Sequence, residues 1–184
     1  MLAHAGITFQ HIDFGPSHRQ PANGIITIDD SFDEHFAQLG VVFGSPTGNP
    51  IYWMGADYGF SAAASSLNMG DPRTGELTNH PLRVEFLTPV LAASIHGVDG
   101  GGDIDTLTLR AYTYADGLVE SSSVTSNFAA GHTVSVFADR IDYILIEQTG
   151  VAHGVFLDDL RYVQVPAPST LALLGFGLLA RRRR

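Results

Sequence analysis

Apolar and polar residues alternate with a period of two over much of the chain between residues 7 and 163. In the segment 106–114, Leu107, Leu109 and Ala111 would share one face of an extended strand, and the residues between them are polar or aromatic. Similar short runs occupy residues 24–28, 41–43, 51–54, 82–87, 91–98, 118–124, 133–137, 141–147 and 155–163. Each run predicts a strand that turns one face to the core.

Turn-forming residues separate these runs. Gly, Pro, Asn and Asp cluster at residues 48–50, 71–75, 99–103 and 115–117. These residue types favour tight turns because they fix or tolerate backbone conformations that do not continue a strand. About ten short strands with such separators predict an all-β protein, an antiparallel β-sandwich of the jelly-roll type.

Two segments depart from the alternation. Ser31 and Glu34 have the spacing of a helix capping box, and apolar residues follow at near-helical spacing, so we expect one short helical turn near 31–39. Residues 59–70 have no firm period and are expected to form a loop.

The C-terminus combines three features in a fixed order. Pro166 and Pro168 precede ten uncharged residues, 171–180, and four arginines end the chain. Arginine clusters stay on the cytoplasmic side of a membrane, so this order predicts that the body faces away from the cytoplasm. The expected short apolar helix rises only about 15 Å against a hydrocarbon core of about 30 Å, so it would span marginally. The alternative is a buried C-terminal strand with a basic end.

The first residues lack the charged start and apolar stretch of a secretory signal. Ala3 and Ala5 have the small-x-small spacing of a cleavage site, so residues 1–6 are interpreted as the remnant of a signal peptide, with chance as the alternative. The chain then divides into this remnant, a β-sandwich domain at 7–163 and a sorting tail at 164–184.

Charge excludes one class of partner. The chain has 19 Asp and Glu, 10 Arg and no Lys, for a net charge of −9, and removing the four terminal arginines leaves −13 for residues 1–180. An acidic surface without lysine repels phosphate backbones, so no nucleic-acid partner is expected. The absence of cysteine excludes disulfides, thiolate zinc sites and a cysteine nucleophile.

Acidic residues near the first and last predicted strands are candidate metal ligands. A jelly roll brings these strands together, and Ca²⁺ takes several oxygen ligands, so Asp13, Asp158 and Asp159 predict a structural Ca²⁺ site. The alternative is a strand-end turn with solvated charges. The loop 99–105 lacks the spacing and the closing Glu of an EF-hand and is expected to be a flexible hairpin.

Other chemistry is less favoured. Eight histidines occur without His-x-His or His-Glu-x-x-His spacing, which argues against zinc. The segment 59–63 approaches the nucleophile-elbow pattern of serine hydrolases but lacks its last glycine. Aromatic rings stack on sugars when exposed and fill sandwich cores when buried. We expect Trp53 in the core, and the candidate glycan contacts are Tyr52, Tyr58, Tyr112 and Tyr114.

The tail resembles the PEP-CTERM sorting tails of Gram-negative surface proteins, in which a Val-Pro-Glu-Pro-Ser stretch precedes an apolar helix and an arginine cluster. Ala167 stands where that family usually has Glu, and the apolar run is several residues shorter. The resemblance implies processing by an exosortase, transient anchoring in the inner membrane, and a final place at the cell surface or in the extracellular matrix, with exopolysaccharide as a partner. The matching residues are Val165, Pro166, Pro168, Ser169, Arg181, Arg182, Arg183 and Arg184.

The body more loosely resembles the β-sandwich domains found ahead of such tails. It shares with them Asp13-Phe14, the segments 39–43 and 111–117, and the Leu-Asp-Asp-Leu at 157–160. That resemblance implies no catalytic chemistry. We therefore predict an exported, non-enzymatic surface or matrix protein sorted through its tail, with a carbohydrate-binding module as the alternative and a hydrolase as the less favoured one.

Overall fold

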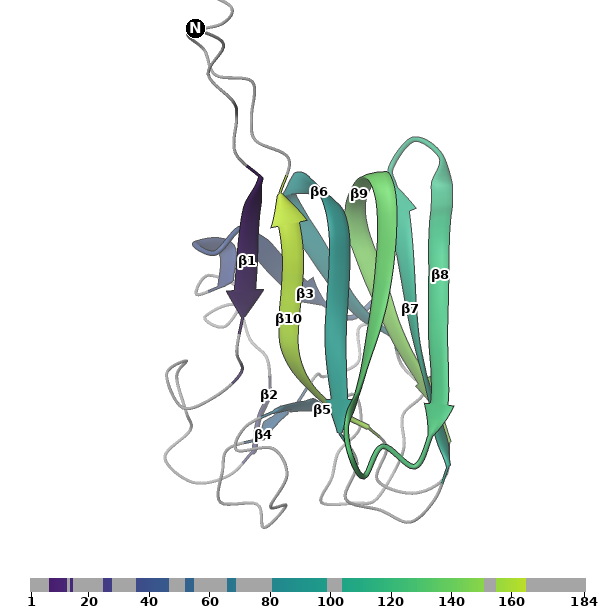
Figure 1. Cartoon of the computed structure of the whole chain (residues 1–184). Coiled ribbons are helices and arrows are strands. Elements are labelled where there is room, and N and C mark those ends of the chain that lie inside the picture. The colour runs from purple at the N-terminus through teal and green to yellow at the C-terminus, as the bar shows by residue number, and fades with distance from the viewer. Residues whose placement is uncertain are drawn as a thin grey trace, which may run out of the picture.

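The computed structural model describes residues 7–12, 14, 25–27, 36–46, 52–54, 66–68, 81–98, 104–150 and 155–164. All strand pairings among them are antiparallel, which confirms the predicted all-β class (Figure 1). The strands are β1 (Thr8–Ile12), β2 (Ile25–Thr27), β3 (Val41–Gly44), β4 (Tyr52–Met54), β5 (Ser66–Asn68), β6 (Leu82–Val98), β7 (Asp105–Thr113), β8 (Gly117–Ser126), β9 (His132–Thr149) and β10 (Phe156–Gln164).

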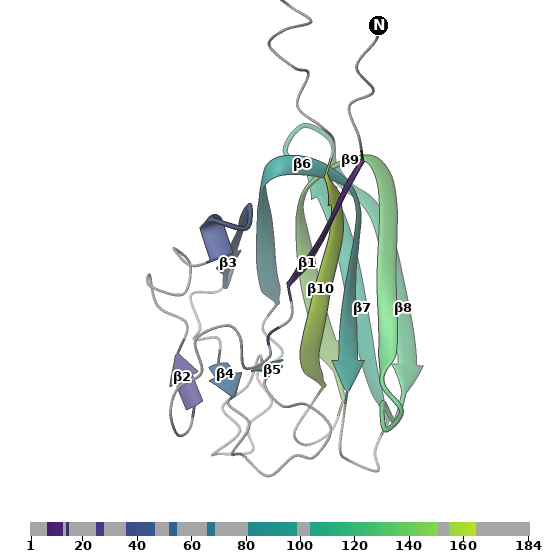
Figure 2. The same cartoon turned by 60° about the vertical axis from the view of Figure 1, so that its left-hand side comes forward.

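Two long strands bend together and so create the two layers of the sandwich. β6 and β9 pair along most of their length, but the register shifts between Glu85 and Val90 and again between Val90 and Ala92. Both ribbons arch over at the same end of the molecule (Figures 1 and 2). Pro89 lies inside the first shift, where its missing N–H interrupts no ladder hydrogen bond. The expected pairs of shorter strands, 82–87 with 91–98 and 133–137 with 141–147, are therefore single bent strands.

We define layer A as β1, β10, residues 90–98 of β6 and residues 132–137 of β9. Layer B consists of β3, the first part of β6, the second part of β9, and β7 and β8. β5 extends from β10 and leads to β4 and β2. The first strand pairs with the last, from Thr8 with Gln164 to Ile12 with Leu160, as the jelly-roll expectation required.

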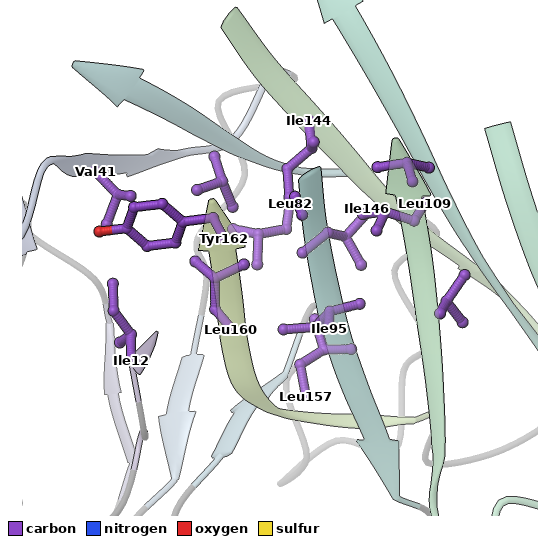
Figure 3. Close-up of a cluster of buried hydrophobic side chains, with 14 of the residues drawn as sticks. Ile12, Val41, Leu82, Ile95, Leu109, Ile144, Ile146, Leu157, Leu160 and Tyr162 are labelled. Atoms are coloured by element: carbon purple, nitrogen blue, oxygen red, sulfur yellow. The ribbon is translucent and has the colours of Figure 1, made fainter. Parts of the chain in front are cut away.

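The core lies between the layers and is made of alternate residues on each strand (Figure 3). In β7, Leu107, Leu109 and Ala111 are fully buried, which confirms the predicted period of two. Tyr162 is also buried, and its hydroxyl donates a hydrogen bond to the carbonyl oxygen of Leu39. Burial raises the pKa of this hydroxyl. The ring therefore fills the core, while its polar end has the partner that a buried tyrosine needs.

Three short elements test the finer predictions. Phe36 and Ala37 have helical backbone, and their carbonyl oxygens accept hydrogen bonds from Leu39 and Gly40; the earlier part of the expected turn lies outside the described residues. The prediction of a loop over 59–70 was wrong at β5, because a three-residue strand is too short to show a period. The tight turn expected at 115–117 is present between β7 and β8.

The described part of the chain contains no helix long and apolar enough to cross a membrane. The expected apolar helix at 171–180 lies outside the described residues.

Candidate functional site

Two rows of cross-strand partners form a groove on the outer face of layer A. Directly paired residues share a face of the sheet, and so do alternate residues of a strand. The first row consists of Phe9, Val163, Ala92 and Phe137. The second row, two residues along each strand, consists of His11, Arg161, Ser94 and Ser135. Both rows point away from the core, since the residues between them, such as Ala93 and Val136, are buried.

Differences in side-chain size between the strands turn these two rows into a groove. Ala92, Ser94 and Ser135 are small and form the floor, whereas Phe9 in β1 and Phe137 in β9 stand at the two sides and are 78% and 69% exposed. The two phenylalanines are three strand spacings apart, roughly 14 Å. The groove holds about 580 Å³, within the range of small-molecule sites. The arrangement presents two aromatic rings on either side of a shallow floor.

A charged cluster lies at one side of the groove. Asp159 accepts hydrogen bonds from His11 through its Oδ1, at 2.5 Å from His11 Nε2, and from Arg161 through its Oδ2, at 3.1 Å from Arg161 Nη2. The backbone at Asp159 has φ of +49°, at the irregularity between the pairings of Asp158 and Arg161 with β6. Such a bulge redirects side chains, and here it brings the carboxylate to its two cationic partners.

The electrostatics of the cluster follow from these contacts. Burial alone would raise the pKa of Asp159, but the hydrogen bond from His11 and the positive charges of His11 and Arg161 outweigh it and lower that pKa. The carboxylate is therefore held in its ionised form, and it ties β1 to β10 beside the groove. His11 and Arg161 keep donors near the groove floor, where hydroxyl or carboxylate groups of a ligand could accept hydrogen bonds.

The candidate glycan contacts have different positions. Tyr112 stacks on Tyr143, with ring centroids 4.9 Å apart and an interplanar angle of 1°, on the outer face of layer B. Tyr114 is exposed in the turn after β7 and lies against the same Tyr143 ring. Tyr52 lies in β4, and Tyr58 lies outside the described residues. A glycan-binding role for these four residues stays a prediction, and the two with described side chains, Tyr112 and Tyr114, do not line the groove.

The predicted metal ligands are partly described. Asp13 lies outside the described residues, and Asp158 and Asp159 are neighbours in β10, where the Asp158 side chain accepts a hydrogen bond from the Asp159 amide. Within the described ranges, no group of three His, Asp or Glu side chains could hold a metal ion. Both oxygens of Asp159 already bind cationic side chains. The calcium site stays a prediction that depends on Asp13.

The groove residues were missed at the sequence level. β1 itself was absent from the predicted runs, because Phe9 and His11 occupy its outer face while Ile12 is buried. Phe137 was included in a predicted strand but not recognised as exposed. An aromatic residue at a position that alternation assigns to the solvent face was the available signal.

The class of protein follows from this geometry: an antiparallel β-sandwich with a shallow aromatic groove on one sheet. Residues 164–184 match the PEP-CTERM protein-sorting motif, so the chain carries this motif at its C-terminus, as predicted. The motif begins at Gln164, the last residue of β10. The motif supports export and a cell-surface route through the membrane.

Solved structures with a similar chain path have low sequence identity. A DUF4465 family protein from Bacteroides caccae is 10% identical, with 85% of this chain and 87% of that chain covered and a TM-score of 0.41. A variant of the carbohydrate-binding module CBM29-2 is 13% identical, with 86% of each chain covered and a TM-score of 0.36. The catalytic domain of a GH87 α-1,3-glucanase is 12% identical, with 88% and 29% covered and a TM-score of 0.39. No curated protein sequence matches the chain.

Proposed function

We propose that this chain is an exported, non-enzymatic protein that is sorted by an exosortase through its tail and then kept at the cell surface or in the extracellular matrix of a Gram-negative bacterium. The observation that carries the proposal is the sorting motif, which starts where the last strand ends. Every strand in the described part of the chain ends at or before that residue, so cleavage within the tail would leave the described strands intact.

Localisation tests this proposal. The chain, expressed behind a cleavable signal peptide in a host with an exosortase, should appear first in the membrane fraction and then as a shorter form that is released or held at the surface. Replacing all four terminal arginines by serine should disturb the membrane stage, because the cytoplasmic anchor is lost. Full-length protein that stays in the cytoplasm and is indifferent to deletion of residues 166–184 would overturn the proposal.

The groove supports a binding function rather than a catalytic one. His11 and Asp159 form the hydrogen-bonded pair that a hydrolase could use, but the nearer of the two serines in the His11 row, Ser94, is two strand spacings away, roughly 10 Å, and Ser135 lies one strand further. A nucleophile has to lie within hydrogen-bonding reach of its base. The polar groups of the groove are therefore placed to orient a ligand.

A saccharide chain is the ligand class that we propose for the groove, and exopolysaccharide is the expected source. Sugar rings offer apolar faces that stack on aromatic rings and hydroxyl groups that accept and donate hydrogen bonds. Phe9 and Phe137 supply two exposed rings, and His11 and Arg161 supply donors beside them. The open, shallow shape suits a chain that lies across the strands better than a small ligand that must be enclosed.

Glycan arrays followed by calorimetry test this second candidate function. Phe137→Ala should weaken binding to any saccharide that the array identifies, whereas Tyr114→Ala should not, although both side chains are exposed aromatics. If Tyr114→Ala weakens binding and Phe137→Ala does not, the tyrosines of layer B are the platform and the groove assignment is wrong. A failure of all glycans to bind would remove the carbohydrate proposal and leave the sorting proposal unaffected.

A further inference from the structure

Among the residues that the structure describes, the end of the sandwich from which the sorting motif starts carries most of the exposed large apolar side chains. We call this the arch end: the bends of β6 and β9, the turn between β7 and β8, and the paired residues Thr8 and Gln164. The β10 arrow ends beside the two arches (Figure 1). Among the described residues, the exposed large hydrophobics at or next to this end are Ile7, Phe9, Leu39, Leu87, Tyr114, Leu118 and Phe137.

Specific contacts hold these segments together at the arch end. The Leu87 amide donates a hydrogen bond to the Gly40 carbonyl oxygen at 2.9 Å, which fixes the bend of β6 beside β3. The Tyr114 amide donates to Asp142 Oδ2 at 2.9 Å, which fixes the β7–β8 turn beside the bend of β9. The exposed apolar side chains are therefore presented by ordered backbone. At the opposite end, Ile104 is the exposed large hydrophobic among the described residues.

We propose that the arch end rests on the lipid surface of the membrane while the tail is inserted, with Leu87 and Leu118 entering the headgroup region. This inference rests on the proposed membrane stage of sorting. Six residues separate Gln164 from Leu171, the first residue of the apolar run. Six residues span at most about 20 Å even when fully extended, so an inserted tail keeps the arch end close to the bilayer.

Contact between the arch end and lipid would strengthen the membrane attachment of the protein. The apolar run of ten residues, six of them Leu or Phe, is about half the length of a typical membrane-spanning helix, so it would be a weak anchor. A weak anchor gains from a second contact on the same molecule, because the second contact forms at a high effective concentration. The apolar side chains of the arch end can provide that contact without any additional segment.

The charges at this end decide which lipid the surface favours. Asp116 and Asp139 are exposed, and the guanidinium of Arg140 is paired with Asp142 at 2.8 Å. The arch end is therefore acidic around its apolar side chains, and anionic headgroups would repel it. We expect contact with zwitterionic phosphatidylcholine vesicles and, once the four terminal arginines are replaced by serine, no strengthening when anionic lipid is added.

The cysteine-free sequence allows a site-by-site test on the full chain. Leu87→Cys, Leu118→Cys and Ile104→Cys, each labelled with an environment-sensitive fluorophore, report on the two ends; these positions are 60%, 53% and 66% exposed. With phosphatidylcholine vesicles, the labels at 87 and 118 should shift to the blue and be quenched by lipid-borne quenchers, and the label at 104 should do neither.

Three outcomes would overturn the inference in distinguishable ways. If the protein floats with the vesicles but the labels at 87 and 118 stay in water, the tail inserts and the arch end does not rest on lipid. If the protein does not float at all, the membrane stage of the proposed function fails together with the inference. If the labels shift without vesicles in proportion to protein concentration, the apolar side chains bind a second copy of the chain instead.

Discussion

The outer faces of the two layers are built on the same alternation but differ in what covers them. On layer B, long side chains fill the surface: Tyr112 stacks on Tyr143, and the guanidinium of Arg83 lies 4.0 Å from the Tyr143 ring centroid. Arg83 also pairs with Glu85 at 2.5 Å. On layer A, the small side chains of Ala92, Ser94 and Ser135 form a groove floor, and the exposed rings of Phe9 and Phe137 stand at its two sides. The outer side chains of layer B pack against and pair with one another, whereas those of layer A leave room for a ligand.

This contrast shows that the volumes of the side chains across the strands determine whether one face of a sheet has room for a ligand. Along β6, Ala92 and Ser94 face outward in layer A, whereas Arg83 and Glu85 face outward in layer B. The same strand therefore contributes a groove floor in one half and an ion pair in the other. The register between neighbouring strands places these outward-facing side chains side by side, so that together they form one surface.

Blocking the groove should have the largest effect. Ala92→Trp places a large ring on the groove floor, between Val163 and Phe137, so saccharide binding should be lost completely while the fold is retained. Calorimetry and far-ultraviolet circular dichroism measure the two effects. The matched control is Thr108→Trp on the outer face of layer B, which should bind as well as the parent chain. Undiminished binding by Ala92→Trp would place the ligand elsewhere.

The features that could be predicted from the sequence are those that depend on residues close together along the chain. The alternation in β7 and the turn after Thr113 depend on neighbours in the chain, and both were predicted. The groove depends on four strands that are far apart in sequence, with Phe9 and Phe137 separated by more than a hundred residues. The residues next to Ala92 in the sequence do not indicate that it lies on a groove floor, because that position depends on its partners in β9 and β10. Similarly, the continuity of β6 through Pro89 depends on the bend that β9 makes beside it.

Truncating the central ring of layer B should reduce stability rather than binding. Tyr143→Ala removes the stack with Tyr112 and the cation–π contact with Arg83, so the free energy of unfolding should fall by about 2 kcal/mol. Phe137→Ala, at an exposed site of layer A, should change it by no more than about 0.5 kcal/mol. Urea denaturation compares the two. Equal losses would mean that the outer faces of both layers contribute alike to stability, which would contradict a self-packed layer B and an open layer A.

Acid should protonate the Asp142 carboxylate and so weaken the hydrogen bonds by which it fixes the β7–β8 turn. Asp142 is buried, which alone would raise its pKa, but hydrogen bonds from Arg140 and the Tyr114 amide lower that pKa overall. A lowered folded-state pKa gives stabilisation that is fully present above the unfolded value of about 3.9 and is lost as the pH falls through the folded value.

Asp142→Asn should therefore reduce the free energy of unfolding by about 1–2 kcal/mol at neutral pH, and the difference from the parent chain should shrink at strongly acidic pH. Denaturant titrations at several pH values measure this. Asp116→Asn, an exposed carboxylate in the same turn, provides the comparison for general charge effects. A difference that grows on acidification would contradict the sign of the pKa change.

Calcium should have the smallest effect on stability, and it would act on layer A alone, through β10. Both oxygens of Asp159 already bind His11 and Arg161. Asp158 is therefore the described candidate ligand to test. For a site with a Kd of roughly 0.1–1 mM, about 1 mM Ca²⁺ would stabilise the fold by about 0.4–1.4 kcal/mol. Thermal unfolding with calcium or with EGTA measures this. Asp158→Asn should abolish the response and Asp142→Asn should keep it, because Asp142 lies in β9, where its carboxylate binds the β7–β8 turn. A melting temperature that EGTA leaves unchanged would mean that the carboxylates of Asp158 and Asp159 serve only β10 and its cationic partners.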